Sequence, residues 1–204
     1  MLRAGLTGGY ATGKSFVARE LEQLGCFVIY ADRLGHKVLE PGGGAYDPTV
    51  RAFGPAILAP DGSIDRKKLG SVAFSSHEAL QRLSGFVHPA VFRLEEELLI
   101  GFDRQNPAGI AVIEAAILIE TGRCERFRRL ILTACEEETQ IERGMKRDGL
   151  TREQVLARIA HQMPLEEKKR HAHYVIDTGG PKEATARRVR EIHRELSRLA
   201  QSGG

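Results

Sequence analysis

The sequence predicts an α/β protein built on a doubly wound, parallel, five-stranded sheet. Short apolar runs alternate with segments of helical periodicity along the 204 residues, which is the pattern of strands buried on both faces. The first run, residues 2–6, leads through a glycine-rich loop directly into a helical segment. A chain of this length is expected to hold one core with insertions.

The glycine-rich loop, Gly8 to Ser15, reads GGYATGKS and fits G-x-x-x-x-G-K-[ST] at every defined position. Gly8 and Gly13 let the backbone turn tightly, so that successive N–H groups point at a phosphate, and the helix opening at Lys14 adds its positive dipole end. We expect Lys14 to reach the β- and γ-phosphates of a nucleotide and the Ser15 hydroxyl to ligate Mg²⁺. The alternative is a glycine-rich turn that binds nothing, which the flanking strand and helix disfavour.

Composition narrows the class of protein. The net charge is +3, the pI is about 8.8, and 22 of the 30 basic residues are arginines. This excess is too small to indicate nucleic-acid binding, and it suits anionic small molecules. Cys26, Cys124 and Cys135 predict neither a disulfide framework nor a zinc site, so we expect a reducing, cytoplasmic setting. The chain enters its first strand directly and no apolar run approaches about 18 residues, so neither a signal peptide nor a membrane span is expected.

Four further apolar runs are predicted to be strands, at residues 27–30, 108–116, 130–134 and 174–177, and a closing helix follows over 182–200. The carboxyl ends of parallel strands meet at one edge of the sheet, where ligands of such folds bind. We therefore expect the loop Thr178–Pro181 at this edge, where its backbone groups could hold a purine.

Asp32 follows the second strand and is expected on the same edge as the phosphate loop. A carboxylate there can accept the proton of an attacking hydroxyl or help to hold the metal. Aspartate is also a good N-cap, so Asp32 could cap a helix over residues 33–39. The two roles are compatible with each other.

Residues 34–100 are predicted to form an all-helical insertion on the ligand edge of the sheet. Its first part carries turn signals such as the segment 41–44, and its second part has a long helical pattern over residues 76–98. The pair His88-Pro89 falls inside this pattern, so we expect a break or a kink there.

Residues 136–162 are densely charged and predict a pair of helices. Arg143 and Arg147 are spaced i,i+4 on one helix face, and Thr151 opens the second helix. One interpretation is a solvated helical pair laced with exchangeable salt bridges. The other is a lid over residues 139–165, whose arginines fold over a bound triphosphate and neutralise charge on the transferring group.

Taken together, these features resemble the dephospho-CoA kinases, which catalyse the last step of coenzyme A synthesis. The matching pieces run nearly end to end, and their ordered set is far more specific than any member. They are Leu6-Thr7-Gly8-Gly9 with Gly13-Lys14-Ser15, Ala31-Asp32, Glu40-Pro41-Gly42, Asp61-Gly62, Asp65-Arg66 with Leu69, His88-Pro89, Leu118 with Glu120, Gln140 with Arg143, Arg147-Asp148, Arg158-Ile159-Ala160 with Gln162, and Val175-Ile176-Asp177.

The resemblance implies a P-loop kinase that moves the γ-phosphoryl group of ATP to the ribose 3′-hydroxyl of dephospho-CoA. It implies that Asp32 is the base and that Arg143 or Arg147 lies at the phosphates. The residues implied near the acceptor are Thr7, Asp32, Arg66 and His88. The expected ATP contacts are Gly8, Gly9, Ala11, Thr12, Gly13, Lys14, Ser15 and Phe16, with Mg²⁺ on Ser15.

The resemblance also implies how the chain is divided and what it meets. The expected parts are core over 1–33, a helical acceptor-binding insertion over 34–100, core over 101–138, a lid over 139–165 and core over 166–204. The expected partners are ATP, Mg²⁺ and dephospho-CoA, with no nucleic acid or membrane, and the chain is expected to act as a monomer or a small homo-oligomer.

Five positions depart from the family pattern. Ala11 stands where the family often has glycine and Phe16 where it often has threonine, and neither change removes a required donor. Ala116 replaces a family proline in the acceptor-side loop. His173 and Thr178 replace an aspartate and an asparagine around the last strand, where contacts to the base are expected.

Two other interpretations stay open. One is a different P-loop kinase, acting on nucleosides, nucleotides or shikimate-like alcohols. The other is a nucleotide-dependent switch, because residues 32–35 spell D-x-x-G. That string begins only 18 residues after Lys14, which is too soon for the usual switch segment, and the sequence contains no N-K-x-D guanine reader. A switch also has no use for a base placed against an acceptor hydroxyl.

Overall fold

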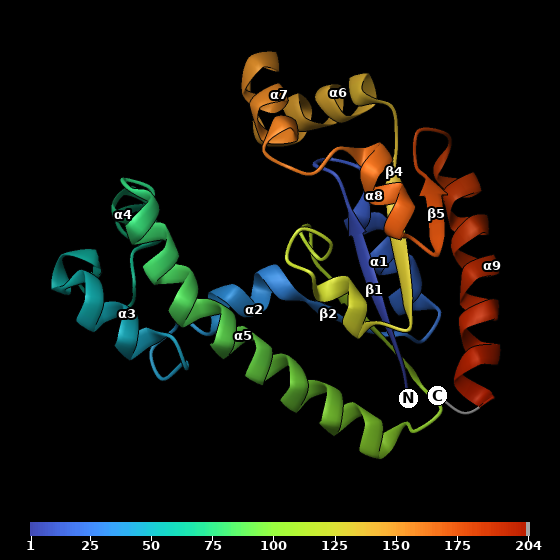
Figure 1. Ribbon diagram of the computed structural model, residues 1–204, viewed down its shortest axis with the longest axis horizontal. Coiled ribbons are helices and arrows are strands. Elements are labelled where there is room, and N and C mark those ends of the chain that lie inside the picture. Colours follow the sequence, from blue (N-terminus) through green and yellow to red (C-terminus); the bar gives the residue numbers. More distant parts are fainter. Residues whose placement is uncertain (203–204) are drawn as a thin grey trace. The chain divides into compact units, whose positions relative to one another are not determined.

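The structure is a computed structural model, and it describes residues 1–202 (Figure 1). The chain divides into two compact units. The sheet unit consists of Met1–Ile29 together with the chain from Phe102 onward, and the helical unit consists of Tyr30–Gly101.

The sheet has five strands in the order β2-β3-β1-β4-β5. The strands are β1 (Leu2–Gly8), β2 (Phe27–Tyr30), β3 (Ile110–Glu114), β4 (Arg129–Ala134) and β5 (Tyr174–Asp177). Strand β1 pairs in parallel with both β3 and β4, and β4 pairs in parallel with β5. The predicted α/β fold with a parallel five-stranded sheet is therefore confirmed, although β3 is shorter at both ends than the run 108–116.

The central strands are apolar on both faces because both faces are covered. All five residues of β3 are buried, and in β1 only Arg3 is not. Such continuous burial is what a parallel sheet between two layers of helices requires. The order of the strands puts β1 at the middle of the sheet, so the loop that follows it starts between the ends of β3 and β4.

Helices α1 (Lys14–Gln23) and α9 (Lys182–Gln201) pack against each other and against β1, and α8 (Leu165–His171) packs against β4 (Figure 1). Helix α9 buries the apolar stripe Val189, Ile192 and Leu196 and leaves its charged face to water. The sequence analysis missed α8, because its seven residues, LEEKKRH, have only one apolar side chain and hence no apolar periodicity.

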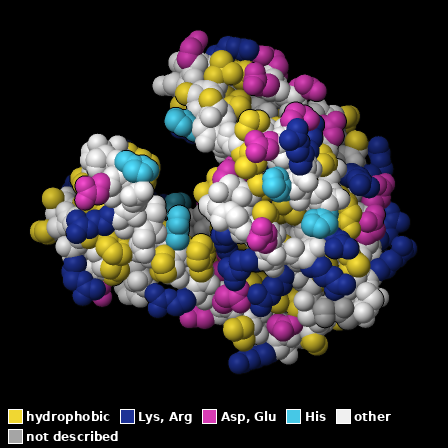
Figure 2. All heavy atoms as spheres, viewed as in Figure 1, with side chains coloured by type: hydrophobic (Ala, Val, Ile, Leu, Met, Phe, Trp, Pro, Cys, Tyr) yellow, Lys and Arg dark blue, Asp and Glu magenta, His cyan; other side chains and the backbone are white. Residues whose placement is uncertain are grey.

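Helices α6 (Glu137–Asp148) and α7 (Arg152–Ala160) pack against each other, as the charge pattern predicted. Thr151 caps α7 through a capping box: its side chain accepts from the Gln154 N–H, and the Gln154 side chain accepts from the Thr151 N–H. Acidic and basic side chains are mixed on the surface of this pair (Figure 2). Two short 3₁₀ turns, η1 (Pro55–Ile57) and η2 (Arg123–Arg126), complete the elements.

The helical unit contains α2 (Ala31–Lys37), α3 (Tyr46–Phe53), α4 (Arg66–Ala73) and most of α5 (His77–Gln105). Its core is formed by Ile57, Ile64 and Leu69 with partly buried neighbours that include Tyr46. One isolated antiparallel bridge joins Leu58 and Ile64 of this unit. Within residues 1–202, no helix has the length and apolar character needed to cross a bilayer.

Of the break or kink expected at His88-Pro89, the break is wrong, because α5 is continuous from His77 to Gln105 with Pro89 inside it. The kink stays a prediction. A proline in a helix removes one N–H donor and crowds the carbonyl four residues earlier, here that of Gly85. Gly85 and Pro89 are both exposed, so water can hydrate the orphaned carbonyl. After the proline, the helix is held in place by four buried residues, Ala90, Val91, Glu95 and Leu99.

Replacing Pro89 should therefore stabilise α5. We expect Pro89→Ala to raise the free energy of unfolding by about 1–3 kcal/mol, because alanine restores the donor and removes the crowding. Urea denaturation followed by far-UV circular dichroism measures this change. The matched control is Pro48→Ala in the first turn of α3, where the N–H has no helical partner, and it should give no gain. A loss of stability in Pro89→Ala would contradict this account.

Candidate active site

The phosphate loop connects β1 to α1 in a backbone shape that its small residues permit. Gly13 is the N-cap of α1, with φ 82°, and Ala11 has φ 56°, the one positive φ of a non-glycine residue within residues 1–202. Gly8 pairs with Thr133 of β4, and a Cβ on Gly8 would lie 2.1 Å from the Thr133 hydroxyl oxygen. A side chain at position 8 is therefore excluded by the neighbouring strand.

Three buried threonines fix the loop to the ends of β4 and β5. The Thr12 hydroxyl donates to the Gly9 carbonyl at 2.8 Å and lies 2.8 Å from the Thr133 hydroxyl. The Thr178 hydroxyl lies 2.8 Å from the Thr12 carbonyl and 3.1 Å from the Ala134 carbonyl. Since the side chain of Thr12 is fully buried, this residue can meet a ligand through its backbone alone.

Lys14 and Ser15 open α1, where the helix N-terminus favours anions. The Lys14 ammonium donates to the carbonyls of Gly9 at 3.1 Å and Gly8 at 3.3 Å, so it lies across the loop. Ser15 is exposed in the same turn. Phe16 presents its ring to the Lys182 ammonium, which lies 5.9 Å from the ring centre.

The two arginines of α6 have different surroundings. Arg143 donates to the Thr178 carbonyl at 2.6 Å and to the Thr178 hydroxyl at 3.3 Å, so it fixes the loop after β5. Arg147 is largely exposed, forms a bidentate pair with Asp148 at 2.8 and 2.9 Å, and lies over the Tyr10 ring. Hydrogen bonds from Arg147 and then Tyr10 hold the pKa of Asp148 well below its ordinary value. This anion keeps Arg147 beside the phosphate loop.

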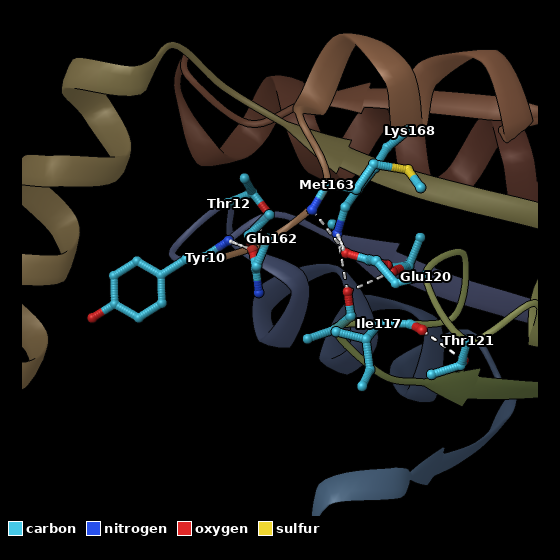
Figure 3. Close-up of polar contacts among 12 residues, drawn as sticks. Tyr10, Thr12, Ile117, Glu120, Thr121, Gln162, Met163 and Lys168 are labelled. Carbon is cyan, nitrogen blue, oxygen red and sulfur yellow. Dashed lines mark hydrogen bonds and ion pairs between the residues drawn. The ribbon is translucent and has the colours of Figure 1, made fainter. Parts of the chain in front are cut away.

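An ion pair whose lysine is fully buried lies near the carboxyl ends of β1 and β3 (Figure 3). The ammonium of Lys168, on α8, is 2.6 Å from a Glu120 oxygen and 3.2 Å from the Ala116 carbonyl. Thr7 is fully buried, and its hydroxyl donates to the same Ala116 carbonyl at 3.2 Å. The sequence analysis missed Lys168 because it lies in the unexpected helix α8.

The helical unit carries the other three predicted residues, and all three are exposed. Arg66 is the first residue of α4, which Asp65 caps, and His88 lies on α5 beside the Phe92 ring.

The alternative role of Asp32 as an N-cap is wrong. Helix α2 starts at Ala31, directly after β2, so Tyr30 is the N-cap and Asp32 lies inside the first turn. Its carboxylate therefore stabilises the helix dipole and remains accessible.

A cavity of about 820 Å³ opens in the sheet unit beyond the ends of β4 and β5, between α6, α7 and α8. Its charged side chains are Glu136, Glu137, Glu166, Asp177 and Lys169. Of the described residues of the phosphate loop, Gly9 alone lines it. A wall with this excess of carboxylates repels a triphosphate, so the cavity is not a candidate for the donor site.

This parallel sheet, with a G-x-x-x-x-G-K-S loop between its first strand and first helix, defines a P-loop nucleotide-binding protein. A sequence model of the dephospho-CoA kinase family matches residues 2–183. A dephospho-CoA kinase of Geobacter sulfurreducens is 46% identical over 188 residues, which cover 92% of this chain and 95% of the relative.

Two solved structures share the fold. The Thermus thermophilus protein TT1252 superposes with a TM-score of 0.80 and 33% identity, over 96% of this chain and 97% of that one. A dephospho-CoA kinase from Campylobacter jejuni has a TM-score of 0.67 and 26% identity, over the same shares of the two chains. The chain therefore belongs to the dephospho-CoA kinase family, whose members phosphorylate dephospho-CoA to coenzyme A. It is a kinase, and ATP is the phosphoryl donor of this class.

The close approach at Gly8 can be tested by adding one methyl group. Gly8→Ala should lower the affinity for ATP at least tenfold, because the Cβ displaces Thr133 and with it the bond to Thr12. Isothermal titration calorimetry measures the affinity. The matched control is Gly101→Ala on α5, where an added Cβ meets no heavy atom of residues 1–202 within 4 Å. Unchanged ATP binding in Gly8→Ala would show that the loop does not depend on this contact.

Proposed function

We propose that this chain transfers the γ-phosphoryl group of ATP to the ribose 3′-hydroxyl of dephospho-CoA, with the phosphates held by the loop Gly8–Ser15. The observation that carries this assignment is the shape of the loop, in which Gly13 caps α1 and the Lys14 ammonium lies over the loop carbonyls. The N-terminus of α1 also carries the positive end of the helix dipole, which favours a bound anion.

Lys14 supplies positive charge at the donor site. Its ammonium lies 3.1 and 3.3 Å from the carbonyls of Gly9 and Gly8, and a charge-assisted bond to a phosphate oxygen is stronger than a bond to a neutral carbonyl. Phosphoryl transfer asks a protein mainly for positioning and for charge stabilisation. Lys14 with the loop amides provides both at the β- and γ-phosphates. The remaining contacts to ATP would come chiefly from backbone atoms, at Gly9, Ala11, Thr12 and Phe16.

Mg²⁺ fits the residues at hand. Ser15 offers an exposed hydroxyl in the first turn of α1, and residues 1–202 contain no cluster of three or more His, Cys, Asp or Glu side chains that could cage a metal. Mg²⁺ commonly keeps several waters and takes few protein ligands besides substrate phosphates. When bound by Ser15 and the nucleotide, the ion would neutralise charge on the phosphates.

The helices α6 and α7 would act as a lid over residues 139–165. Arg147 reaches solvent beside the Tyr10 ring and is free to turn toward a triphosphate after exchanging its exposed partner Asp148. Arg143 is held by Thr178 and would act at the phosphates only by giving up that bond, so we assign the larger electrostatic role to Arg147.

The acceptor would be held by the helical insertion over 34–100, with Asp32 as the base. Asp32 is exposed, so a substrate hydroxyl can approach its carboxylate. Arg66 and His88 are exposed donors of the same unit and suit the diphosphate and the ribose of the acceptor. Buried Thr7 would act through its bond to Ala116, by shaping the loop after β3. We place the protein in the cytoplasm, as a monomer or small homo-oligomer that acts on small molecules and not on nucleic acid.

A substrate panel tests the assignment. ADP release with Mg-ATP should be strong with dephospho-CoA and weak with adenosine, AMP, shikimate or pantothenate. Slow ATP hydrolysis at the same rate with and without the acceptor alcohol would instead indicate a nucleotide-dependent switch. Turnover with a different alcohol would indicate another P-loop kinase.

Asp32→Asn should lower kcat by about 10²–10⁴-fold and leave KM for ATP nearly unchanged, because the amide cannot take the hydroxyl proton. Steady-state kinetics with dephospho-CoA measures both constants. The control is Asp47→Asn, which replaces another exposed aspartate in the first turn of a helix of the same unit. Near-normal kcat in Asp32→Asn would refute its role as base.

Lys14→Ala should lower kcat by about 10²–10³-fold and also weaken ATP binding, because the variant lacks the charge at the β- and γ-phosphates. Binding of a non-hydrolysable ATP analogue separates the two effects. Arg190→Ala, on the exposed face of α9, removes a positive charge elsewhere in the sheet unit and serves as control. An unchanged kcat in Lys14→Ala would remove Lys14 from the site.

A further inference from the structure

The Lys168–Glu120 ion pair is buried more deeply than an ordinary surface pair. The Lys168 side chain is 0% exposed and that of Glu120 is 21% exposed. A buried ammonium needs a carboxylate and further acceptors, and here Glu120 and the Ala116 carbonyl supply them. The pair therefore fixes α8 to the segment after β3 in one arrangement.

The same Glu120 oxygen also holds the backbone of the segment between α7 and α8. It accepts the N–H of Met163 at 3.3 Å (Figure 3). Lys168, at 2.6 Å from this oxygen, neutralises and orients it. The position of Met163 is thus set from the core of the sheet unit and not only by the helices on either side of it.

The residue before Met163 reaches the phosphate loop. The side-chain oxygen of Gln162 accepts the N–H of Tyr10 at 2.7 Å (Figure 3). Tyr10 lies within the loop, and the guanidinium groups of Arg147 and Arg158 both lie over its ring. One chain of contacts therefore runs from Lys168 through Glu120, Met163 and Gln162 to the backbone of the loop.

We propose that Lys168 and Glu120 are positioning residues for phosphoryl transfer, which hold Gln162 so that it fixes the phosphate loop in its ATP-binding shape. The inference rests on the proposed role of this loop. Neither residue of the ion pair needs to touch a substrate, because both act through Gln162. Hydrogen bonds from Thr133 and Thr178 fix the phosphate loop at Thr12. The hydrogen bond from the Tyr10 N–H to Gln162 fixes it at a second point.

A double-mutant cycle between Gln162 and Lys168 tests this coupling. Gln162→Ala and Lys168→Met should each lower kcat/KM for ATP by about tenfold to a hundredfold, because a small displacement of the loop misplaces the phosphates. The double variant should be no more than about twofold worse than Gln162→Ala alone, because Lys168 acts through Gln162. Losses that multiply would overturn the proposal, because they indicate two independent structural roles.

Loss of one buried charge can prevent folding, so the cycle includes a charge-balanced variant. Glu120→Gln combined with Lys168→Met leaves no unpaired buried charge. Its melting temperature should be higher than that of Lys168→Met, whereas its kcat/KM for ATP should stay at least tenfold below wild type. Wild-type kcat/KM in this variant would overturn the proposal, whatever its stability.

The matched controls are Arg188→Met and Glu191→Gln, which open an exposed pair of 2.9 Å on α9. Both should keep wild-type kcat/KM. Lys14→Ala separates the two levels of the argument. If Lys14→Ala is inactive while the Gln162 and Lys168 variants are fully active, only the positioning role fails. If Lys14→Ala is also fully active, the proposed function of the loop fails.

Discussion

The fit of the phosphate loop against the end of β4 is the constraint on which the rest of the site depends. Gly8 leaves no room for a side chain beside Thr133, and the hydroxyls of Thr12 and Thr133 meet at 2.8 Å in the space that remains. This contact requires β1 and β4 to be neighbours, which the strand order supplies. Thr178 adds β5 to the same cluster, and Arg143 then connects that loop to α6.

The parts of the fold that the sequence predicts well are those with strong periodicity or an unambiguous motif. The strands over 27–30, 130–134 and 174–177 are apolar, and the capped start of α7 carries its own signal in Thr151. The parts it predicts poorly depend on tertiary context. Pro89 does not break α5. The carbonyl that it orphans is hydrated at the exposed face of the helix, and the buried face that follows it in sequence outweighs the local cost of the proline. Helix α8 has no apolar stripe, and its one fully buried side chain is a lysine.

The site shows the same division. The motif identifies Lys14 and Ser15, because the chemistry of phosphate binding restricts residue type and spacing together. The braces around the loop could not be found in this way. Thr133, Thr178 and Gln162 lie far from the loop in sequence, and each is an ordinary polar residue whose role appears only when the strands and helices are assembled. Lys168 carries no local signal at all, since a lysine in a charged segment is usually exposed.

Ala11 has a left-handed backbone, a conformation that costs a residue with a Cβ about 1–2 kcal/mol relative to the ordinary helical one. Alanine also samples fewer conformations than a glycine would at this position, both in the unfolded chain and in an empty loop. The methyl group therefore narrows the set of shapes that the loop visits before a nucleotide arrives. Less ordering is then needed on binding. The strained backbone at Ala11 therefore costs some stability of the free protein and reduces the entropy that is lost when the triphosphate binds.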